Sequence, residues 1–208
     1  MIHISGGVWR GRRLAVPNEP WIRPTMGKIR LALFTLLQPY LAESRVLDLF
    51  SGCGLLGLEA LSRGAREVFF VDQQQKAVQS IAKNVTLCGV RQQCTLIQGD
   101  LLQERTWNRI ALEESPASLC PPLHQKRFDL VLMDPPYRQG WIPLMVQRLR
   151  QSDLLAPGAI VAAEQEALAE AVAVEEWLLL QNRRYGDTRI TVWQHTAVAK
   201  QSDKGVAC

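Results

Sequence analysis

Several features of membrane, secreted and metal-binding proteins are missing from this chain of 208 residues. No apolar run approaches the roughly 18–20 residues that a membrane-spanning helix needs, and the first residues lack the apolar segment of a secretory signal. The five cysteines form no C-x-x-C pair, which argues against a zinc site and against a disulfide framework. The three histidines have no spacing typical of metal ligands. We therefore expect a cytoplasmic protein that contains no metal.

Positive charge is concentrated at one end of the chain. Residues 1–30 have a net charge of +5, whereas the rest of the chain has a net charge of −1. Trp9 and Trp21 lie among these basic residues, and arginine with aromatic side chains suits phosphate contact and base stacking. A solvated basic tail is the alternative. We predict RNA contacts from Arg10, Arg12, Arg13, Arg23, Lys28 and Arg30.

Strand-like and helix-like apolar patterns alternate after the N-terminal segment. We expect strands at 45–50, 67–71, 93–98, 128–133 and 158–163, and helices at 28–41, 55–63, 74–87, 101–112 and 140–150. This alternation predicts an α/β fold of the Rossmann-like kind, a mostly parallel sheet with helices on both faces. Two final segments, 176–183 and 188–195, flank a Tyr-Gly-Asp turn and predict an antiparallel hairpin at one edge of a seven-stranded sheet.

The same pattern suggests three parts. Residues 1–42 would form an RNA-contacting hairpin, expected over 1–22, and a helix. Residues 43–195 would form the catalytic domain, and residues 196–208 a flexible tail. Residues 113–127 contain three prolines and no periodicity, which predicts a loop inserted before the fourth strand.

A glycine-rich loop follows the first strand of this domain. Gly52, Gly54 and Gly57 match G-x-G-x-x-G, a pattern that lets a ligand approach the backbone and that usually indicates a dinucleotide site. However, Asp48 lies at the strand end just before the loop, where its carboxylate would repel a pyrophosphate. It would attract an ammonium group instead. S-adenosylmethionine has an α-amino group and no phosphate, so the loop favours that cofactor.

Three further acids follow strands in the same way. Asp72 is placed to bind a ribose, Asp100 to accept from an adenine amine, and Asp134 ends the fourth strand. Each alone is typical of a helix cap or turn, but parallel strands bring their carboxyl ends to one edge, where α/β sheets bind ligands. The predicted cofactor contacts are Asp48, Ser51, Gly52, Gly54, Asp72, Asp100 and Leu101.

The turn Asp134-Pro-Pro-Tyr137 gives the second chemical signal. Consecutive prolines make it rigid and fix the direction of its carbonyls. The Asp134 carboxylate and the Pro135 carbonyl could accept both hydrogens of an exocyclic –NH2 group, while Tyr137 stacks on the ring that bears it. The alternative is a strand that merely ends at a Pro-Pro turn. We predict that Asp134, Pro135 and Tyr137 are catalytic.

Taken together, the glycine loop and the Pro-Pro turn resemble class I S-adenosylmethionine-dependent amino-methyltransferases. Residues 5–14, 23–25, 58–65 and 185–189 further resemble the RsmD family of bacterial 16S ribosomal RNA guanine-N2 methyltransferases, over about residues 2–193. This resemblance implies methylation of guanine 966 in small-subunit rRNA, naked or within an assembling subunit. The chain departs from the family at Gly27 and Leu31, where acids are common, so no role of those acids carries over.

Three other functions fit some of these features. A DNA adenine-N6 or a protein glutamine-N5 methyltransferase would use the same two motifs, but the basic, aromatic N-terminal segment favours RNA. A nicotinamide-dependent oxidoreductase would fit the glycines, but not Asp48 or the Pro-Pro turn. An inactive RNA-binding module would be expected to have lost one of the motifs.

Overall fold

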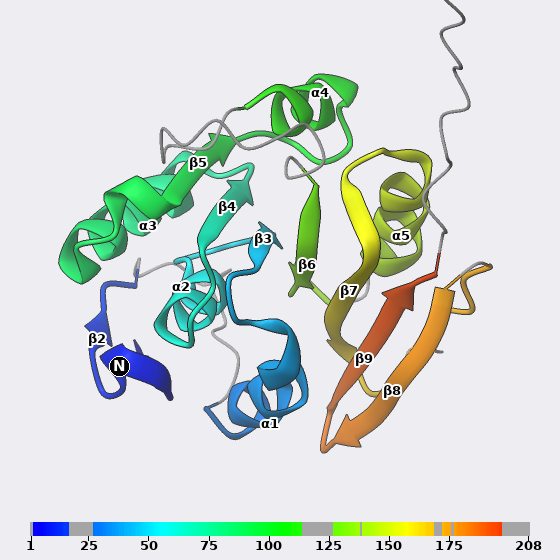
Figure 1. The fold of residues 1–208 in the computed structure, drawn as a ribbon, viewed down its shortest axis with the longest axis horizontal. Helices are drawn as coiled ribbons and strands as arrows, with labels where there is room; N and C mark the ends of the chain where they lie inside the picture. Colours follow the sequence, from blue (N-terminus) through cyan, green and yellow to red (C-terminus); the bar gives the residue numbers. More distant parts are fainter. Residues whose placement is uncertain are drawn as a thin grey trace, which may run out of the picture.

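One seven-stranded sheet forms the centre of the molecule (Figure 1). The computed structural model describes residues 2–16, 27–113, 127–137, 139–168, 172–175 and 177–196. The strand order is β5-β4-β3-β6-β7-β9-β8, in which β3 to β7 are parallel and β9 is antiparallel to both β7 and β8. The predicted fold class is therefore confirmed. The strands are β3 (Arg45–Leu49), β4 (Glu67–Asp72), β5 (Cys94–Gln98), β6 (Phe128–Met133), β7 (Leu155–Glu166), β8 (Trp177–Tyr185) and β9 (Thr188–His195).

Helices cover both faces of the sheet, which explains why its central strands are almost continuously apolar. Side chains alternate between the faces: Val46 of β3 packs into one core and Leu47 into the other. Helices α1 to α3 pack on the first face, and α4 and α5 on the second. Their bounds are α1 (Gly27–Leu37), α2 (Leu55–Ser62), α3 (Gln75–Cys88), α4 (Glu104–Leu112) and α5 (Trp141–Gln151), with short 3-10 turns η2 (Gln38–Tyr40) and η3 (Arg91–Gln93).

Two element boundaries differ from the predictions for identifiable reasons. Helix α1 ends at Leu37, not at residue 41, and a 3-10 turn that contains Pro39 follows. Proline lacks the N–H that would continue the helix and disfavours helical geometry in the residue before it. Strand β7 spans Leu155–Glu166, beyond the predicted 158–163, because its antiparallel partner β9 pairs with it as far as Glu166.

The N-terminal segment packs against the same core as the sheet. Strands β1 (Ile2–His3) and β2 (Arg13–Leu14) form a small antiparallel pair around the 3-10 turn η1 (Gly7–Trp9). Ile4 and Leu14 join α1 to α3 in the first core. The predicted hairpin over 1–22 is described only to residue 16. Most of the predicted insertion and tail, residues 114–126 and 197–208, also lies outside the described residues.

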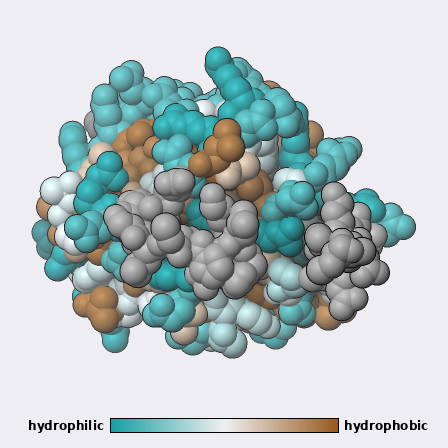
Figure 2. Space-filling model, turned by 45° about the horizontal axis from the view of Figure 1, so that its top comes forward, coloured by the Kyte–Doolittle hydropathy of each residue, from teal (hydrophilic) through white to brown (hydrophobic). Residues whose placement is uncertain are grey.

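One face of the described surface is mainly polar. Figure 2 shows a largely hydrophilic face with small, separate hydrophobic patches. Exposed large apolar side chains are scattered over different elements, such as Leu87 on α3 and Leu112 on α4, which is ordinary for a protein surface. Within the described residues, no helix has the length and hydropathy to cross a membrane.

Candidate active site at the carboxyl edge of the sheet

Four aspartates meet at one edge of the sheet. Asp48 lies within β3 and Asp72 ends β4. Asp100 closely follows β5, and Asp134 directly follows β6. These four strands are parallel neighbours in the order β5-β4-β3-β6, so their carboxyl ends form a continuous row. The structure thus brings together the acids that the sequence pattern singled out.

The glycine loop is held tightly between these strand ends. The Ser51 hydroxyl donates to the Asp48 carbonyl at 2.6 Å and accepts from the Val71 N–H at 2.9 Å. Phe50 has a φ of +62°, a left-handed conformation that is strained for a bulky side chain. Gly54, with a φ of +80°, precedes α2. A Cβ atom at Gly57 would lie 2.3 Å from the Phe70 ring, so glycine there allows α2 to pack closely on β4.

Asp48 is buried beneath this loop and has few compensating partners. Its side chain is 1% exposed, and Oδ2 accepts from the Gly57 N–H at 2.9 Å. Burial raises the pKa of Asp48 well above its usual range; the bond from Gly57 lowers it, and the negative charges of Asp134 and Asp72 raise it further. A cation bound at this point would favour the ionised carboxylate, so the site suits a positively charged ligand.

Asp72 and Asp100 retain capacity to accept from a ligand. Asp72 accepts one backbone N–H on each oxygen, from Gly52 at 2.9 Å and from Gln74 at 2.8 Å, and burial raises its pKa. Asp100 accepts from the Leu102 N–H at 2.9 Å and from the Gln103 side chain at 3.3 Å. A carboxylate has about four lone-pair sites, so each of these acids can accept further bonds.

Leu101, between these polar groups, is buried. Its carbonyl accepts from the indole N–H of Trp107 at 2.9 Å. The Gly99 N–H donates to the Asp72 carbonyl at 3.0 Å, which ties the ends of β4 and β5 together. The loop after β5 therefore has a fixed position beside the glycine loop.

The Pro-Pro turn places a half-exposed aromatic ring beside Asp134. Pro135 is buried, whereas Tyr137 is 41% exposed. The Tyr137 hydroxyl lies 3.0 Å from Thr188 Oγ1 and donates to Glu164 Oε1 at 3.3 Å. Burial raises the pKa of Tyr137 to about 12, so the phenol stays protonated at neutral pH. The hydrogen bonds to Thr188 and Glu164 thus fix the hydroxyl, while part of the Tyr137 side chain remains accessible.

Three residues next to this site were not among the predicted site residues: two support the Pro-Pro turn, and one contacts Phe50 of the glycine loop. Glu164 and Thr188 come from β7 and β9, and only the fold brings them to Tyr137. An acid within the apolar segment 160–164 was a usable signal, because buried acids usually have a specific partner. The third, Trp141 at the start of α5, lies edge-on to Phe50 with ring centroids 5.2 Å apart.

The predicted RNA-contacting residues divide into three groups: exposed residues, one residue outside the described part of the chain, and one buried residue. Arg10 and Arg12 precede β2, Arg13 begins it, and all three are exposed. Arg12 donates to the Leu87 carbonyl at 2.7 Å. Lys28 is exposed on α1. Arg23 lies outside the described residues. Arg30 forms the third group, and its predicted role is wrong.

Arg30 is 3% exposed and faces the protein interior. Its Nε lies 3.4 Å from Glu59 Oε2, and its Nη2 donates to the His3 carbonyl at 2.7 Å. Charge counting along the sequence placed it with the surface arginines, because the buried acid that pairs with it lies on a different element, α2. Arg30 thus contributes to packing of the N-terminal segment, and its guanidinium is inaccessible to RNA.

Glu59 is the centre of a buried polar cluster, formed by Glu59, Ser5, Arg30 and Arg63, which we call the Glu59 cluster. Glu59 is fully buried and accepts from the Ser5 N–H at 2.7 Å, the Ser5 hydroxyl at 2.8 Å and Arg63 Nε at 2.8 Å. Further along the segment, the side chain of Asn84 in α3 accepts a hydrogen bond from the Ala15 N–H and donates one to the Ala15 carbonyl. These contacts fix the basic N-terminal segment on α2 and α3.

Comparison with known proteins agrees with this geometry. The sequence model of a family described as "Conserved hypothetical protein 95" matches residues 2–194. The chain is 31% identical to Ribosomal RNA small subunit methyltransferase D of Haemophilus influenzae, over 93% of this chain and 94% of the relative. It is 30% identical to the protein of the same name from Escherichia coli K12, over 94% and 91%.

Solved structures show the same fold. The structure of Escherichia coli yhhF superposes with a TM-score of 0.75 at 29% identity, and the match covers 95% of this chain and 99% of that one. Family match, sequence relatives and fold therefore agree over almost the whole chain. The chain belongs to the family of Conserved hypothetical protein 95, which is the RsmD family that its motifs resemble.

Proposed function

We propose that this protein transfers a methyl group from S-adenosylmethionine to the exocyclic N2 of a guanine in small-subunit ribosomal RNA. The observation that supports this most strongly is the meeting of the glycine loop and the Asp-Pro-Pro-Tyr turn at one sheet edge, in a member of the RsmD family. The family relation supports guanine 966 as the target.

The acids of the sheet edge suit S-adenosylmethionine better than a dinucleotide. Asp48 would hold the ammonium group, because its burial next to two other acids favours a cation and disfavours a pyrophosphate. Asp72 would accept from the ribose hydroxyls and Asp100 from the adenine amine, while Ser51, Gly52, Gly54 and Leu101 shape the cavity. When bound, S-adenosylmethionine supplies an activated methyl group on sulfur.

The Pro-Pro turn would position the nucleophile. The N2 lone pair of guanine is delocalised into its ring, so N2 is weakly nucleophilic until its hydrogens are held. Asp134 and the Pro135 carbonyl would accept these hydrogens and direct the lone pair at the methyl group, and alignment of this kind can supply much of the rate. Asp134 would also be a neighbouring acceptor for the proton that N2 releases when it gains the methyl group.

Tyr137 would stack on the guanine and fix its plane. Its hydroxyl is hydrogen-bonded to Thr188 and Glu164, so the orientation of the ring is fixed before the base binds. A paired base cannot enter such a site, so the target must be single-stranded or flipped out, at a cost of a few kcal/mol. Arg10, Arg12, Arg13, Arg23 and Lys28 would bind the surrounding RNA phosphates. We place this reaction in the cytoplasm, on rRNA or on an assembling subunit.

The test is a transfer assay with competing substrates. The protein is incubated with methyl-labelled S-adenosylmethionine and, separately, with deproteinised small-subunit rRNA, small-subunit particles, DNA and total protein. Digested products are then identified by mass spectrometry. Labelled N2-methylguanosine from rRNA or particles is the expected product. N6-methyladenine in DNA or methylglutamine in protein would instead favour one of the alternative amino-methyltransferases.

A further inference from the structure

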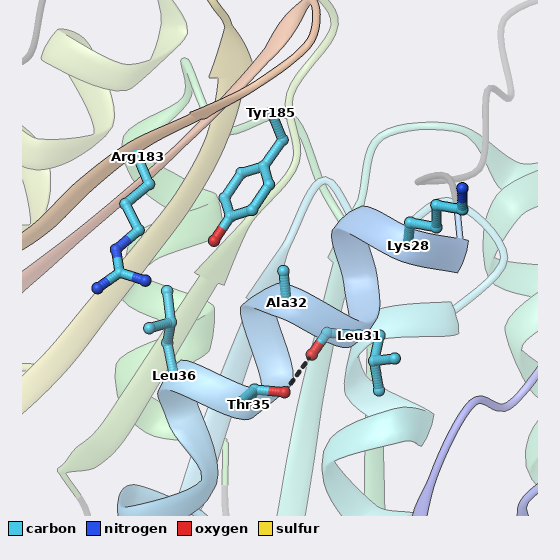
Figure 3. A pocket seen from close by; sticks show the side chains of 7 residues that line it. All are labelled: Lys28, Leu31, Ala32, Thr35, Leu36, Arg183 and Tyr185. Atoms are coloured by element: carbon cyan, nitrogen blue, oxygen red, sulfur yellow. Dashed lines mark hydrogen bonds between the residues drawn. The ribbon is translucent and has the colours of Figure 1, made fainter.

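A groove of about 350 Å³ lies between α1 and β8, apart from the residues assigned above to cofactor and catalysis (Figure 3). Leu31, Thr35 and Leu36 line it from α1, and Arg183 and Tyr185 line it from β8. Lys28, at the start of α1, also borders it. Among the described residues, its lining therefore combines two cations, a phenol and several apolar side chains, and includes no acid.

The groove adjoins the Pro-Pro turn. Tyr185 is the cross-strand partner of Thr188, and Thr188 Oγ1 lies 3.0 Å from the Tyr137 hydroxyl. Arg183 is likewise paired with Ile190, which belongs to the core on the α1 side of the sheet. Cross-strand partners point to the same face, so Arg183, Tyr185 and Thr188 all face the side on which α1 packs. The groove is thus a neighbour of the site where the target base would stack.

The arrangement of charge in the groove suits a single RNA strand. Figure 3 shows Lys28 and Arg183 toward opposite ends of the groove, with the Tyr185 ring between them over α1. Cations at both ends can bind successive phosphates, and the aromatic ring with Leu31 and Leu36 offers an apolar surface for the nucleoside between them. The volume lies within the range of small-molecule sites. An acidic peptide would leave the aromatic and apolar centre without a matching group.

We propose that this groove binds a nucleotide adjacent to the target guanine and so holds the unpaired strand while the guanine occupies the catalytic site. The inference rests on the proposed function, because it takes RNA as the substrate. Lys28 and Arg183 bind the phosphates on either side of this nucleotide, and Tyr185 contacts its base. They are positioning residues, since the reacting atoms lie at the neighbouring turn.

The main test is the double variant Lys28→Ala/Arg183→Ala. Its matched control is Arg105→Ala/Arg109→Ala, which removes two exposed charges from α4 on the opposite face of the sheet. RNA affinity is measured over a salt series without cofactor, and KM and kcat are measured separately. We expect affinity for single-stranded substrate RNA to fall roughly 10-fold and the salt slope to flatten by about 1.4, which is about 0.7 for each phosphate contact. KM for RNA should rise, with kcat and S-adenosylmethionine binding unchanged.

A second pair of variants adds a negative charge to the groove while leaving Lys28 and Arg183 in place. Thr35→Glu introduces an acid into the groove and should weaken RNA binding, whereas Thr35→Gln, of matched size, should not. Wild-type RNA affinity and salt slope in both Lys28→Ala/Arg183→Ala and Thr35→Glu would overturn the inference. Because binding is measured without methyl transfer, failure of the groove is distinguishable from failure of the proposed function, which would appear as a wild-type enzyme that does not methylate rRNA guanine.

Discussion

Glu59 and Asp48 are two carboxylates with the same burial and opposite surroundings. Each is at most 1% exposed. Glu59 accepts three hydrogen bonds and lies beside the guanidinium groups of Arg30 and Arg63. Asp48 accepts from the Gly57 backbone and has the acids Asp72 and Asp134 as its charged neighbours. Opposite charges therefore compensate one another within the Glu59 cluster, whereas the acids next to Asp48 raise its pKa further.

This difference distinguishes a buried charge that stabilises the fold from a buried charge that a ligand would compensate. A buried charge is tolerated when opposite charges and hydrogen bonds compensate it, and the Glu59 cluster meets that condition while fixing the N-terminal segment. Asp48 has one backbone hydrogen bond, and the neighbouring acids Asp134 and Asp72 raise its pKa beyond the effect of burial. Perturbed groups of this kind gather at functional sites. The sheet edge is therefore where a cationic ligand would bind, while the Glu59 cluster stabilises the protein without one.

The largest expected effect is loss of stability on breaking the Glu59 cluster. Glu59→Ala leaves the buried Arg30 and the partly buried Arg63 without their acid, and removing one partner of a buried ion pair costs about 3–5 kcal/mol. Urea denaturation should show this fall in the free energy of unfolding. Glu59→Gln keeps acceptor capacity for Ser5 and should lose less. A Glu59→Ala protein within about 1 kcal/mol of wild type would mean that the cluster is not structural.

The next effect concerns catalysis and not stability. Asp134→Ala removes an acceptor for the reacting amine at a half-exposed position. We expect kcat to fall on the order of 10²-fold, while the Kd for S-adenosylmethionine stays close to that of the wild type. Steady-state kinetics with rRNA and calorimetry with the cofactor check both parts. Normal turnover by Asp134→Ala would contradict the role given to the Pro-Pro turn.

A smaller effect is the pH dependence of folding stability that arises from Asp48. Its folded-state pKa is raised, so the folded protein holds this proton to higher pH than the unfolded chain does. The associated stability is fully present below the unfolded pKa of about 3.9 and is lost as pH rises through the folded pKa. Asp48→Asn keeps an acceptor for Gly57 and removes the charge. Thermal melts of the cofactor-free proteins should show Asp48→Asn to be the more stable at neutral pH, with the difference vanishing in acid.

The smallest effect concerns the exposed arginines of the N-terminal segment. Replacing Arg10, Arg12 and Arg13 together by alanine should flatten the salt dependence of RNA binding by about 2, from roughly 0.7 for each phosphate contact. Cofactor binding should be unchanged, because these side chains are exposed and belong to a different segment from the proposed cofactor contacts. A wild-type salt slope in the triple variant would show that this surface does not contact RNA.

Patterns local in sequence predicted most of this molecule. The apolar run at 128–133 predicted the bounds of β6, and the spacing of strand-end acids predicted that Asp48, Asp72, Asp100 and Asp134 share an edge. Period-two and helical periodicities, together with the parallel arrangement that they imply, were sufficient for both.

Contacts between distant elements were not predictable from those patterns. The burial of Arg30 depends on Glu59 of α2, and the support of Tyr137 depends on Glu164 and Thr188 from two other strands. No local signal specifies such pairings, because they follow from how the elements pack. The groove between α1 and β8 has the same origin: Lys28 and Arg183 belong to it only once the sheet has formed.

The central claim is that Asp48 binds a cationic ligand, whereas the charge of Glu59 is already compensated by Arg30 and Arg63. Calorimetry with S-adenosylmethionine tests this claim most directly. Wild type, Asp48→Asn and Glu59→Gln are titrated at neutral pH under conditions in which each is folded. We predict that Asp48→Asn binds the cofactor at least about 10-fold more weakly, as expected for loss of a hydrogen-bonded charge pair, and that Glu59→Gln binds with the wild-type Kd. Equal affinity of wild type and Asp48→Asn, or an equal loss in both variants, would contradict the account.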